Sequence, residues 1–264
     1  MTFITTANMR IVLPSNASAK YFPNNTLSEF QVKLPQAIDL SKGRWEVGLE
    51  EIMFFKSWYN VANAGLSYYE NRRLVKRLKI PDGFYETPTA LLTKLNEQVN
   101  KEIPGQIVFI YDEFTQKCTI GVERTIAKKV YIKLSASLKE IIGNLPPPST
   151  PSIVIAGKEY LTCFVKTPIK LHTIFNVMVY SDICNENIVG DTESPLLRSV
   201  AITKKHWQMQ TSNFTRVQYI PVSKKRVETI SIYIYTDYGT KVPFVDGRVI
   251  CTLDLRRVDT YSYQ

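Results

Sequence analysis

The sequence predicts an antiparallel β-sandwich that carries a small inserted α+β unit. Three observations lead to this fold class. Short segments with an apolar residue at every second position occur in both halves of the 264-residue chain. Turn residues separate these segments without helices between them, which is typical of sandwiches. Near the middle of the chain, the spacing of apolar residues changes to that of helices. One all-β domain with a single interruption is therefore expected.

The strands follow from the alternation. In residues 29–34, Phe30, Val32 and Leu34 alternate with polar residues, so one face of this strand is expected to be buried. The same alternation predicts strands at 45–51, 230–235 and 248–256. Further strands are expected at 9–13, 160–166, 174–180, 198–203 and 215–220.

The middle of the chain predicts two helices and a hairpin. Thr87 followed by Pro88 is a typical helix start, and apolar residues at helical spacing extend the helix over 88–100. A hairpin is expected over 107–123. Ser137 and Glu140 form a capping box for a short helix at 137–142, and a stiff proline-rich linker follows at 145–151. We therefore divide the chain into sandwich strands at 1–73, an inserted unit at 74–150, and the remaining sandwich strands at 151–264.

Composition limits the classes of protein that are plausible. Hydrophobic residues make up 44% of the chain and charged residues 22%, which is enough apolar surface for a substantial core. We find neither an apolar run long enough to cross a bilayer nor a signal peptide. The four cysteines are widely spaced, and we interpret them as buried thiols in a reducing compartment.

Catalytic chemistry has little support in the sequence. The two histidines, His172 and His206, are not in a metal-binding spacing, and no nucleotide-binding or nucleophile motif is present. The carboxylates of residues 182–193 match no calcium loop, so a solvated loop is the favoured interpretation. We therefore expect a protein that is not an enzyme, with no catalytic residue, metal or cofactor.

The net charge of +9 is compatible with phosphate-rich partners. Its densest part, "RRLVKRLK" at 72–79, follows Tyr68 and Tyr69, and single-stranded nucleic-acid binders interleave cations and rings in this way. The favoured alternative is an amphipathic strand with Leu74 and Leu78 facing inward and the cations facing outward.

Several segments, taken in order, resemble the minor capsid (penton) proteins of Polintons, also called Mavericks, and of their adintovirus relatives. The N-terminal part is similar through "LPSNASAKYFPNNTLSEFQVKLPQAIDLSKGRWEVGLEEI", which leads into "WYNV". The C-terminal part is similar through "SPLLRSV" at 194–200, "YIPVSKKRVETISI" at 219–232 and "VPFVDGRVICTLDLRR" at 242–257. The resemblance covers both flanks, whereas the middle is similar only in general character.

This resemblance implies a single jelly-roll sandwich that assembles into a pentamer at the vertices of an icosahedral virion. It also implies that the pentamer docks onto the major capsid protein. Synthesis would take place in the host cytoplasm, and assembly in the nucleus remains an option. The inserted unit would either project toward a partner or simply cover an open edge or face of a sheet.

A ring subunit buries two different patches against its neighbours, and interface cores favour aromatic residues. The dense aromatic run at 54–60, which follows the strand predicted at 45–51, is therefore a candidate subunit interface, against the alternative that Trp58 closes one end of the sandwich. The interface candidates are Phe54, Phe55, Trp58, Tyr59 and Asn60.

The inner face of a capsid looks onto packaged DNA, which scattered cations would contact without reading its sequence. The candidates for this contact are Arg10, Arg72, Arg73, Lys76, Arg77, Lys224, Lys225, Arg226, Arg256 and Arg257. Two other functions stay open. One is a jelly-roll module that binds carbohydrate or a receptor through aromatic loops such as 235–241. The other is a nucleic-acid-binding protein that uses residues 72–79.

Overall fold

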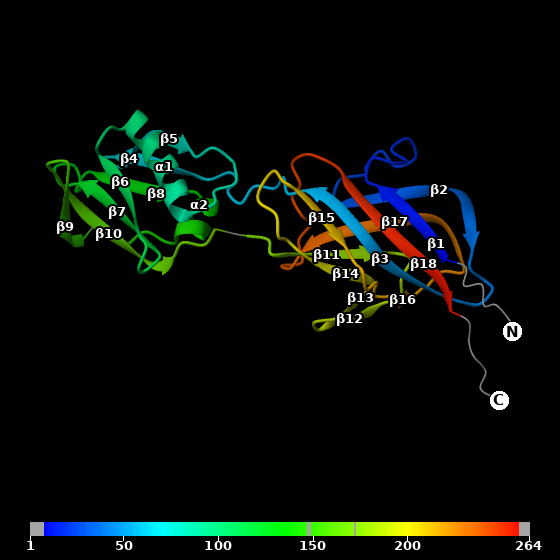
Figure 1. The fold of residues 1–264 in the computed structure, drawn as a ribbon. Coiled ribbons are helices and arrows are strands. Elements are labelled where there is room, and N and C mark those ends of the chain that lie inside the picture. Colours follow the sequence, from blue (N-terminus) through cyan, green and yellow to red (C-terminus); the bar gives the residue numbers. More distant parts are fainter. Residues whose placement is uncertain (1–7, 147–148, 172, 259–264) are drawn as a thin grey trace. The chain divides into compact units, whose positions relative to one another are not determined.

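The computed structural model describes residues 8–146, 149–171 and 173–258 (Figure 1). It divides into two compact units. The first comprises the chain up to Trp58 and again from Ile174, and the second comprises Tyr59–Thr173. The predicted limits of the inserted unit, 74 and 150, are therefore too narrow. The reason is strand pairing. The strand at 65–70, before the predicted start, pairs with residues 130–134, and the strand at 158–168, after the predicted end, pairs with residues 117–123.

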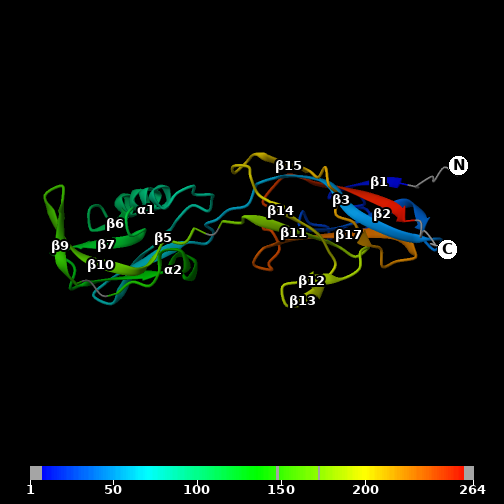
Figure 2. The same cartoon turned by 60° about the horizontal axis from the view of Figure 1, so that its bottom comes forward.

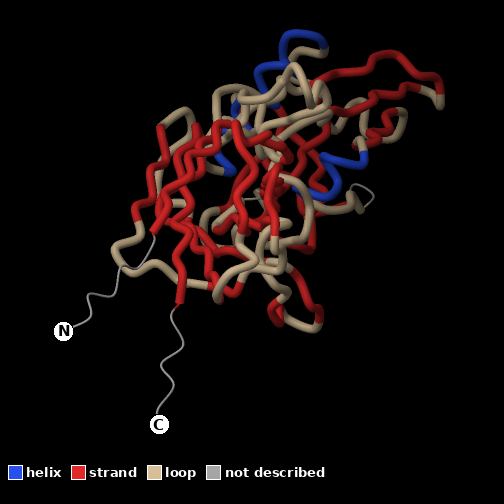
Figure 3. Tube along the Cα trace, turned by 90° about the vertical axis from the view of Figure 1, so that its right-hand side faces the viewer, coloured by secondary structure: helices blue, strands red, loops and turns tan. Residues whose placement is uncertain are grey.

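The first unit is a sandwich of two antiparallel sheets, whose strands are drawn in red in Figure 3. Its eight main strands are β1 (Asn8–Pro14), β2 (Glu29–Asp39), β3 (Arg44–Phe55), β11 (Asn176–Ser181), β14 (Leu196–Ala201), β15 (Met209–Asn213), β17 (Arg226–Thr236) and β18 (Val249–Val258). One sheet has the order β1-β18-β3-β15, with the short β16 (Ile220–Pro221) on β3. The other sheet has the order β14-β11-β17-β2.

This strand order is that of a jelly roll. In chain order the first main strand pairs with the last, the second with the seventh, the third with the sixth, and the fourth with the fifth. Such nested pairing wraps the chain into two facing four-stranded sheets. The predicted fold class, an all-β jelly roll with an inserted α+β unit, is confirmed.

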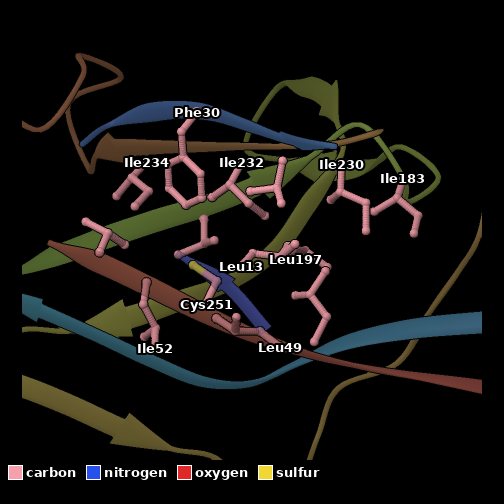
Figure 4. Close-up of a cluster of buried hydrophobic side chains, with 14 of the residues drawn as sticks. Leu13, Phe30, Leu49, Ile52, Ile183, Leu197, Ile230, Ile232, Ile234 and Cys251 are labelled. Atoms are coloured by element: carbon pink, nitrogen blue, oxygen red, sulfur yellow. The ribbon is translucent and has the colours of Figure 1, made fainter. Parts of the chain in front are cut away.

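The core of the jelly roll lies between its two sheets (Figure 4). Phe30, Ile232 and Ile234 come from one sheet, and Ile52 and Cys251 come from the other. A register shift between β18 and β3 inserts one extra residue beside Glu51. Because of this bulge, Leu49 and Ile52, which lie on either side of it in β3, both point into the core, although strict alternation would put them on opposite faces.

The second unit contains two further sheets and the two helices of the described residues, α1 (Pro88–Glu102) and α2 (Ala136–Ile142) (Figure 2). One sheet has the order β6-β7-β10-β9, and the other has the order β5-β4-β8. Their bounds are β4 (Gly65–Glu70), β5 (Arg73–Lys79), β6 (Ile107–Asp112), β7 (Lys117–Glu123), β8 (Val130–Leu134), β9 (Ser149–Ile155) and β10 (Lys158–Pro168).

Helix α1 covers the edge strand β6. The Asn96 side chain accepts a hydrogen bond from the Phe109 amide at 2.8 Å and donates one to the Phe109 carbonyl at 2.7 Å. These bonds satisfy backbone groups that an open edge would leave unpaired. Covering a sheet edge is thus seen for this helix, whereas the projection of the inserted unit toward a partner stays a prediction.

Two sequence-based expectations about strands are wrong. Residues 215–220 form no strand apart from the first residue of β16. The reason is that this segment crosses β3 at Gly48, where an added Cβ would lie 2.5 Å from the Gln218 carbonyl oxygen. Residues 145–151 are not wholly linker, because β9 begins at Ser149. Pro147 and Pro148 lie outside the described residues.

Candidate interaction surfaces

The aromatic run after β3 is mostly buried. Trp58 is 1% exposed and Phe54 is fully buried, and both belong to the jelly-roll core. Their rings contact each other and Phe244 at centroid distances of 5.6 to 6.2 Å. Phe54 and Trp58 therefore present no surface to a neighbouring subunit, and the alternative that Trp58 closes one end of the sandwich is the better one.

The other candidates of this run differ in exposure. Asn60 is buried and holds the backbone of Tyr85, accepting from its amide and donating to its carbonyl, both at 2.8 Å. Its role is thus structural, inside the second unit. Phe55 and Tyr59 are half-buried, and their place in an interface stays a prediction.

The cations on the outer face of the β1-β18-β3 sheet are engaged within the protein. Arg10 pairs with Glu50 at 2.8 Å, and Arg256 pairs with Glu46 at the same distance. The Arg256 guanidinium also stacks on the Tyr219 ring, 3.5 Å from its centroid. Because adjacent strand residues point to opposite faces, Arg257 does not share the face of Arg256, and it lies against Gly43 instead.

Tyr219 belongs to the segment that crosses β3 at Gly48, and it contacts the same group of charged side chains. Its hydroxyl donates a hydrogen bond to Asp254 at 2.5 Å. Burial, followed by this hydrogen bond, raises the pKa of Tyr219 above its ordinary value. The network fixes residues 214–219 over the sheet.

A second group of predicted DNA-facing cations lies at the start of β17. Lys224 pairs with Asp182 at 2.6 Å, and Arg226 pairs with Glu228 at 2.8 Å, while Lys225 is exposed. Asp182 also accepts the Ser231 amide at 2.8 Å, so this carboxylate is a structural acceptor. The jelly-roll cations do not form a single unpaired basic face, and their contact with DNA stays a prediction.

The cations of residues 72–79 lie on the hairpin of β4 and β5. Leu78 is buried as expected, but Leu74 is 44% exposed, so its predicted inward position is wrong. A register shift between Tyr68 and Tyr69 causes the difference, because it turns Leu74 to the outer side. Lys76 pairs with Glu102 at 2.6 Å, whereas Arg72, Arg73 and Arg77 are exposed.

The described residues contain no group of three or more His, Cys, Asp or Glu side chains that could hold a metal ion. Their helices include none long and apolar enough to span a membrane. Burial raises the pKa of the Cys118 and Cys251 thiols to about 12 and that of Cys163 and Cys184 to about 11. Such thiols stay protonated and are poor nucleophiles at neutral pH. His172 lies outside the described residues.

Two exposed patches lie near the two edge strands, β15 and β1, of one sheet of the jelly roll, and the second patch also includes part of β2 in the other sheet. At the β15 edge, Trp207 is 49% exposed and Met209 is 43% exposed. At the β1 edge, Met9 borders a hollow of about 590 Å³ that is otherwise lined by residues 34–39 of β2. Sequence reasoning missed both patches, because neither has an unusual composition.

Trp207 also has an unusual backbone. Its φ is +58°, a region that bulky side chains rarely adopt. Such strain persists only where the surroundings impose it, and it is found most often at functional sites. An exposed tryptophan held in this way is a candidate anchor for a partner.

The fold defines the class: the protein is a jelly-roll β-sandwich whose α+β unit is inserted between the third and fourth main strands, β3 and β11. Among solved structures, the chain is similar to the mavirus penton protein, with 10% sequence identity and a TM-score of 0.47. The match covers 96% of this chain and 100% of the other. No family model and no curated protein matches the sequence.

Proposed function

We propose that the protein is a non-enzymatic structural subunit of the five-fold vertices of an icosahedral capsid. The observation that carries the proposal is the nested pairing of eight strands in two four-stranded sheets, since capsid proteins are a major class of jelly roll. The resemblance of both flanks to minor capsid proteins supports it independently, because those flanks form the jelly roll. The number five and the vertex position follow from that resemblance.

A ring needs head-to-tail contacts between two different patches of each subunit. The two exposed patches meet this requirement because one lies at the β15 edge of a sheet, and the other lies between the opposite edge strand, β1, and residues 34–39 of β2 in the facing sheet. We assign Trp207 and Met209 of one subunit to the Met9 hollow of the next. Apolar anchors that enter a hollow are typical of the energetic centre of an interface.

The proposal is tested by the solution mass of the purified chain from light scattering, with negative-stain images of the same peak. A discrete five-fold ring is the expected result. If only a monomer forms, mixing with the major capsid protein of the same element is expected to give a stable complex. A monomer that ignores the capsid protein and binds glycans would instead favour the carbohydrate-binding function.

The ring contact has its own test. Replacing Trp207 by Ala and Met209 by Ser is expected to dissociate the ring and leave the monomer folded, because both side chains are about half exposed. Ile188→Ser is the matched control, since Ile188 is 81% exposed on the hairpin of β12 (Asn187–Val189) and β13 (Thr192–Ser194). An intact ring in the double variant would contradict the assigned contact.

A further inference from the structure

The outer face of the sheet β5-β4-β8 carries a grid of two rows, which is regular between β4 and β8 and interrupted between β4 and β5 by the register shift at Tyr68 and Tyr69. Ser67 of β4 lies opposite Arg77 on one side and Lys133 on the other. Two residues further along β4, Tyr69 lies opposite Leu74 and Tyr131. Directly opposite residues of antiparallel strands share a face, and residues two apart along a strand do so as well. Rings and cations thus form neighbouring rows about 7 Å apart.

The other face of this sheet is anchored in the core of the second unit. Leu66, Tyr68 and Leu134 are each 3% exposed, and they pack against both helices and the facing sheet. The Tyr68 hydroxyl donates to Gln106 at 2.6 Å. The grid therefore rests on a fixed support. Four of its residues, Ser67, Tyr69, Arg77 and Lys133, line a hollow of about 580 Å³ together with Gly65 and Lys79.

The face is cationic. Arg77 and Lys133 are exposed and form no ion pair within the described part of the chain. Lys79, in the next row, is engaged by Asp82 at 3.2 Å. The turn at the other end of the hairpin adds the exposed cations Arg72 and Arg73. The Asn71 amide donates a hydrogen bond to the Lys129 carbonyl, which holds this turn beside the segment that leads into β8. A polyanion that follows the strands would meet cations at both ends of the grid.

The aromatic row distinguishes between kinds of polyanion. Tyr131 is 62% exposed, and its ring lies 5.8 Å from that of Tyr69, centroid to centroid. Exposed rings beside cations are the shared feature of single-stranded nucleic-acid sites, where bases stack and the backbone follows a positive groove. An acidic peptide would use the cations but not the ring faces. A duplex hides its base faces.

We propose that this face, defined by Tyr69, Arg77, Tyr131 and Lys133, binds single-stranded nucleic acid without sequence preference. Bases stack on Tyr131 and Tyr69, and phosphates lie against Arg77 and Lys133. The assignment concerns the inserted unit alone and does not depend on a capsid role. The sequence-based hypothesis placed Tyr68 beside the cations in a nucleic-acid site. Tyr68 is buried in the core and cannot stack on a base, so Tyr131 takes its place in the proposal.

The test measures binding of the full chain to a fluorescent oligothymidylate of about 16 nucleotides by anisotropy, at several salt concentrations. Tyr131→Ala is expected to weaken binding about tenfold, as expected for loss of one stacked base. The double change Arg77→Ala and Lys133→Ala is expected to reduce the slope of log K against log salt by about 1.4, or about 0.7 per cation.

Matched controls lie on the jelly roll. Tyr238→Ala removes a tyrosine of similar exposure, and Lys204→Ala with Lys205→Ala removes the same charge from an exposed loop. Neither control is expected to change binding. Circular dichroism checks that Tyr131→Ala remains folded.

Four results would overturn the proposal. The first is no binding of the oligothymidylate at low salt. The second is binding that is unchanged in the folded Tyr131→Ala variant, which would indicate unspecific attraction of charge. The third is equal competition by polyglutamate, which would indicate an acidic polypeptide partner. The fourth is tighter binding of duplex DNA than of the single strand.

Discussion

At the scale of single residues, burial decides what an aromatic side chain does. Trp58 and Trp207 are both tryptophans near the ends of strands of one sheet, yet the first is 1% exposed and the second 49%. Trp58 fills space between Phe54 and Phe244. Trp207 leaves half of its surface for a partner. Substitution of Trp58 should therefore reduce the stability of the fold, whereas substitution of Trp207 should affect assembly and leave stability nearly unchanged.

Trp58→Ala is expected to lower the free energy of unfolding by about 3–5 kcal/mol, because it leaves a large cavity in the jelly-roll core. Trp207→Ala should change it by less than about 1 kcal/mol, since it removes a half-exposed ring. Denaturant unfolding followed by circular dichroism measures both. An unchanged midpoint for Trp58→Ala would restore the interpretation of Trp58 as interface surface.

The buried thiols predict a loss of stability in alkali. Burial raises the pKa of Cys251 from 9.0 to about 12, so the folded state keeps its proton where the unfolded state loses it. The unfolded state then binds fewer protons, and stability falls as pH rises from about 9 towards 12. Below pH 9 the full contribution is present.

Cys251→Ala isolates this contribution from the titration of lysines and tyrosines. The variant is expected to be less stable than the parent at neutral pH because of the lost packing, but to lose less stability between about pH 9 and pH 11. Unfolding midpoints measured over this range give the two slopes. Identical slopes would contradict the buried, protonated thiol.

At the scale of elements, the hairpin of β4 and β5 has an unfavourable turn. Its two central residues, Asn71 and Arg72, have φ values of +48° and +65°. This is the backbone of the tight primed turns, in which glycine and asparagine are preferred. Asn71 fits that preference, whereas Arg72 carries a cost for its side chain.

Arg72→Gly is therefore expected to stabilise the hairpin by about 0.5–1 kcal/mol. Arg73→Gly is the matched control, because Arg73 lies in β5 and should lose about 0.5–1 kcal/mol through the greater freedom of glycine when unfolded. Hydrogen exchange of the β4 and β5 amides measures both effects. Faster exchange in Arg72→Gly would contradict the assigned turn.

At the scale of the whole molecule, the two units have separate cores. Among the described residues, the core of the jelly roll draws only on residues before 59 and after 173, and the core of the inserted unit draws only on residues between them. A buried leucine in one core should therefore contribute to the stability of that unit alone.

Leu95→Ala is expected to lower the unfolding transition of the inserted unit, and Leu253→Ala that of the jelly roll, each by about 2–5 kcal/mol. Leu95 is 1% exposed and Leu253 is fully buried. Hydrogen exchange resolved by segment distinguishes the two units. An equal response of both units to either variant would show one cooperative body in place of two.

Local patterns in the sequence determined the elements and their faces. Alternation placed β2, β3, β17 and β18, and the Thr87 cap placed the start of α1, because these signals act between residues a few positions apart. The capping box predicted at Ser137 is wrong, since the N-cap of α2 is Ser135, two residues earlier, which accepts a hydrogen bond from the Leu138 amide. Where alternation failed, as for Leu74, a register shift was the cause. Signals of this range identify a strand but do not select its partner.

The tertiary structure decided the rest. Pairing joins Leu13 to Cys251 and Thr211 to Met53, and no local pattern encodes such long-range choices. The same pairing buried Trp58, exposed Trp207 and brought Lys133 beside Arg77 across Ser67. Composition alone determined that the chain could build a core and carry excess positive charge. Which rings and cations reach a surface together depends on strand order, because strand order alone sets which distant residues become neighbours.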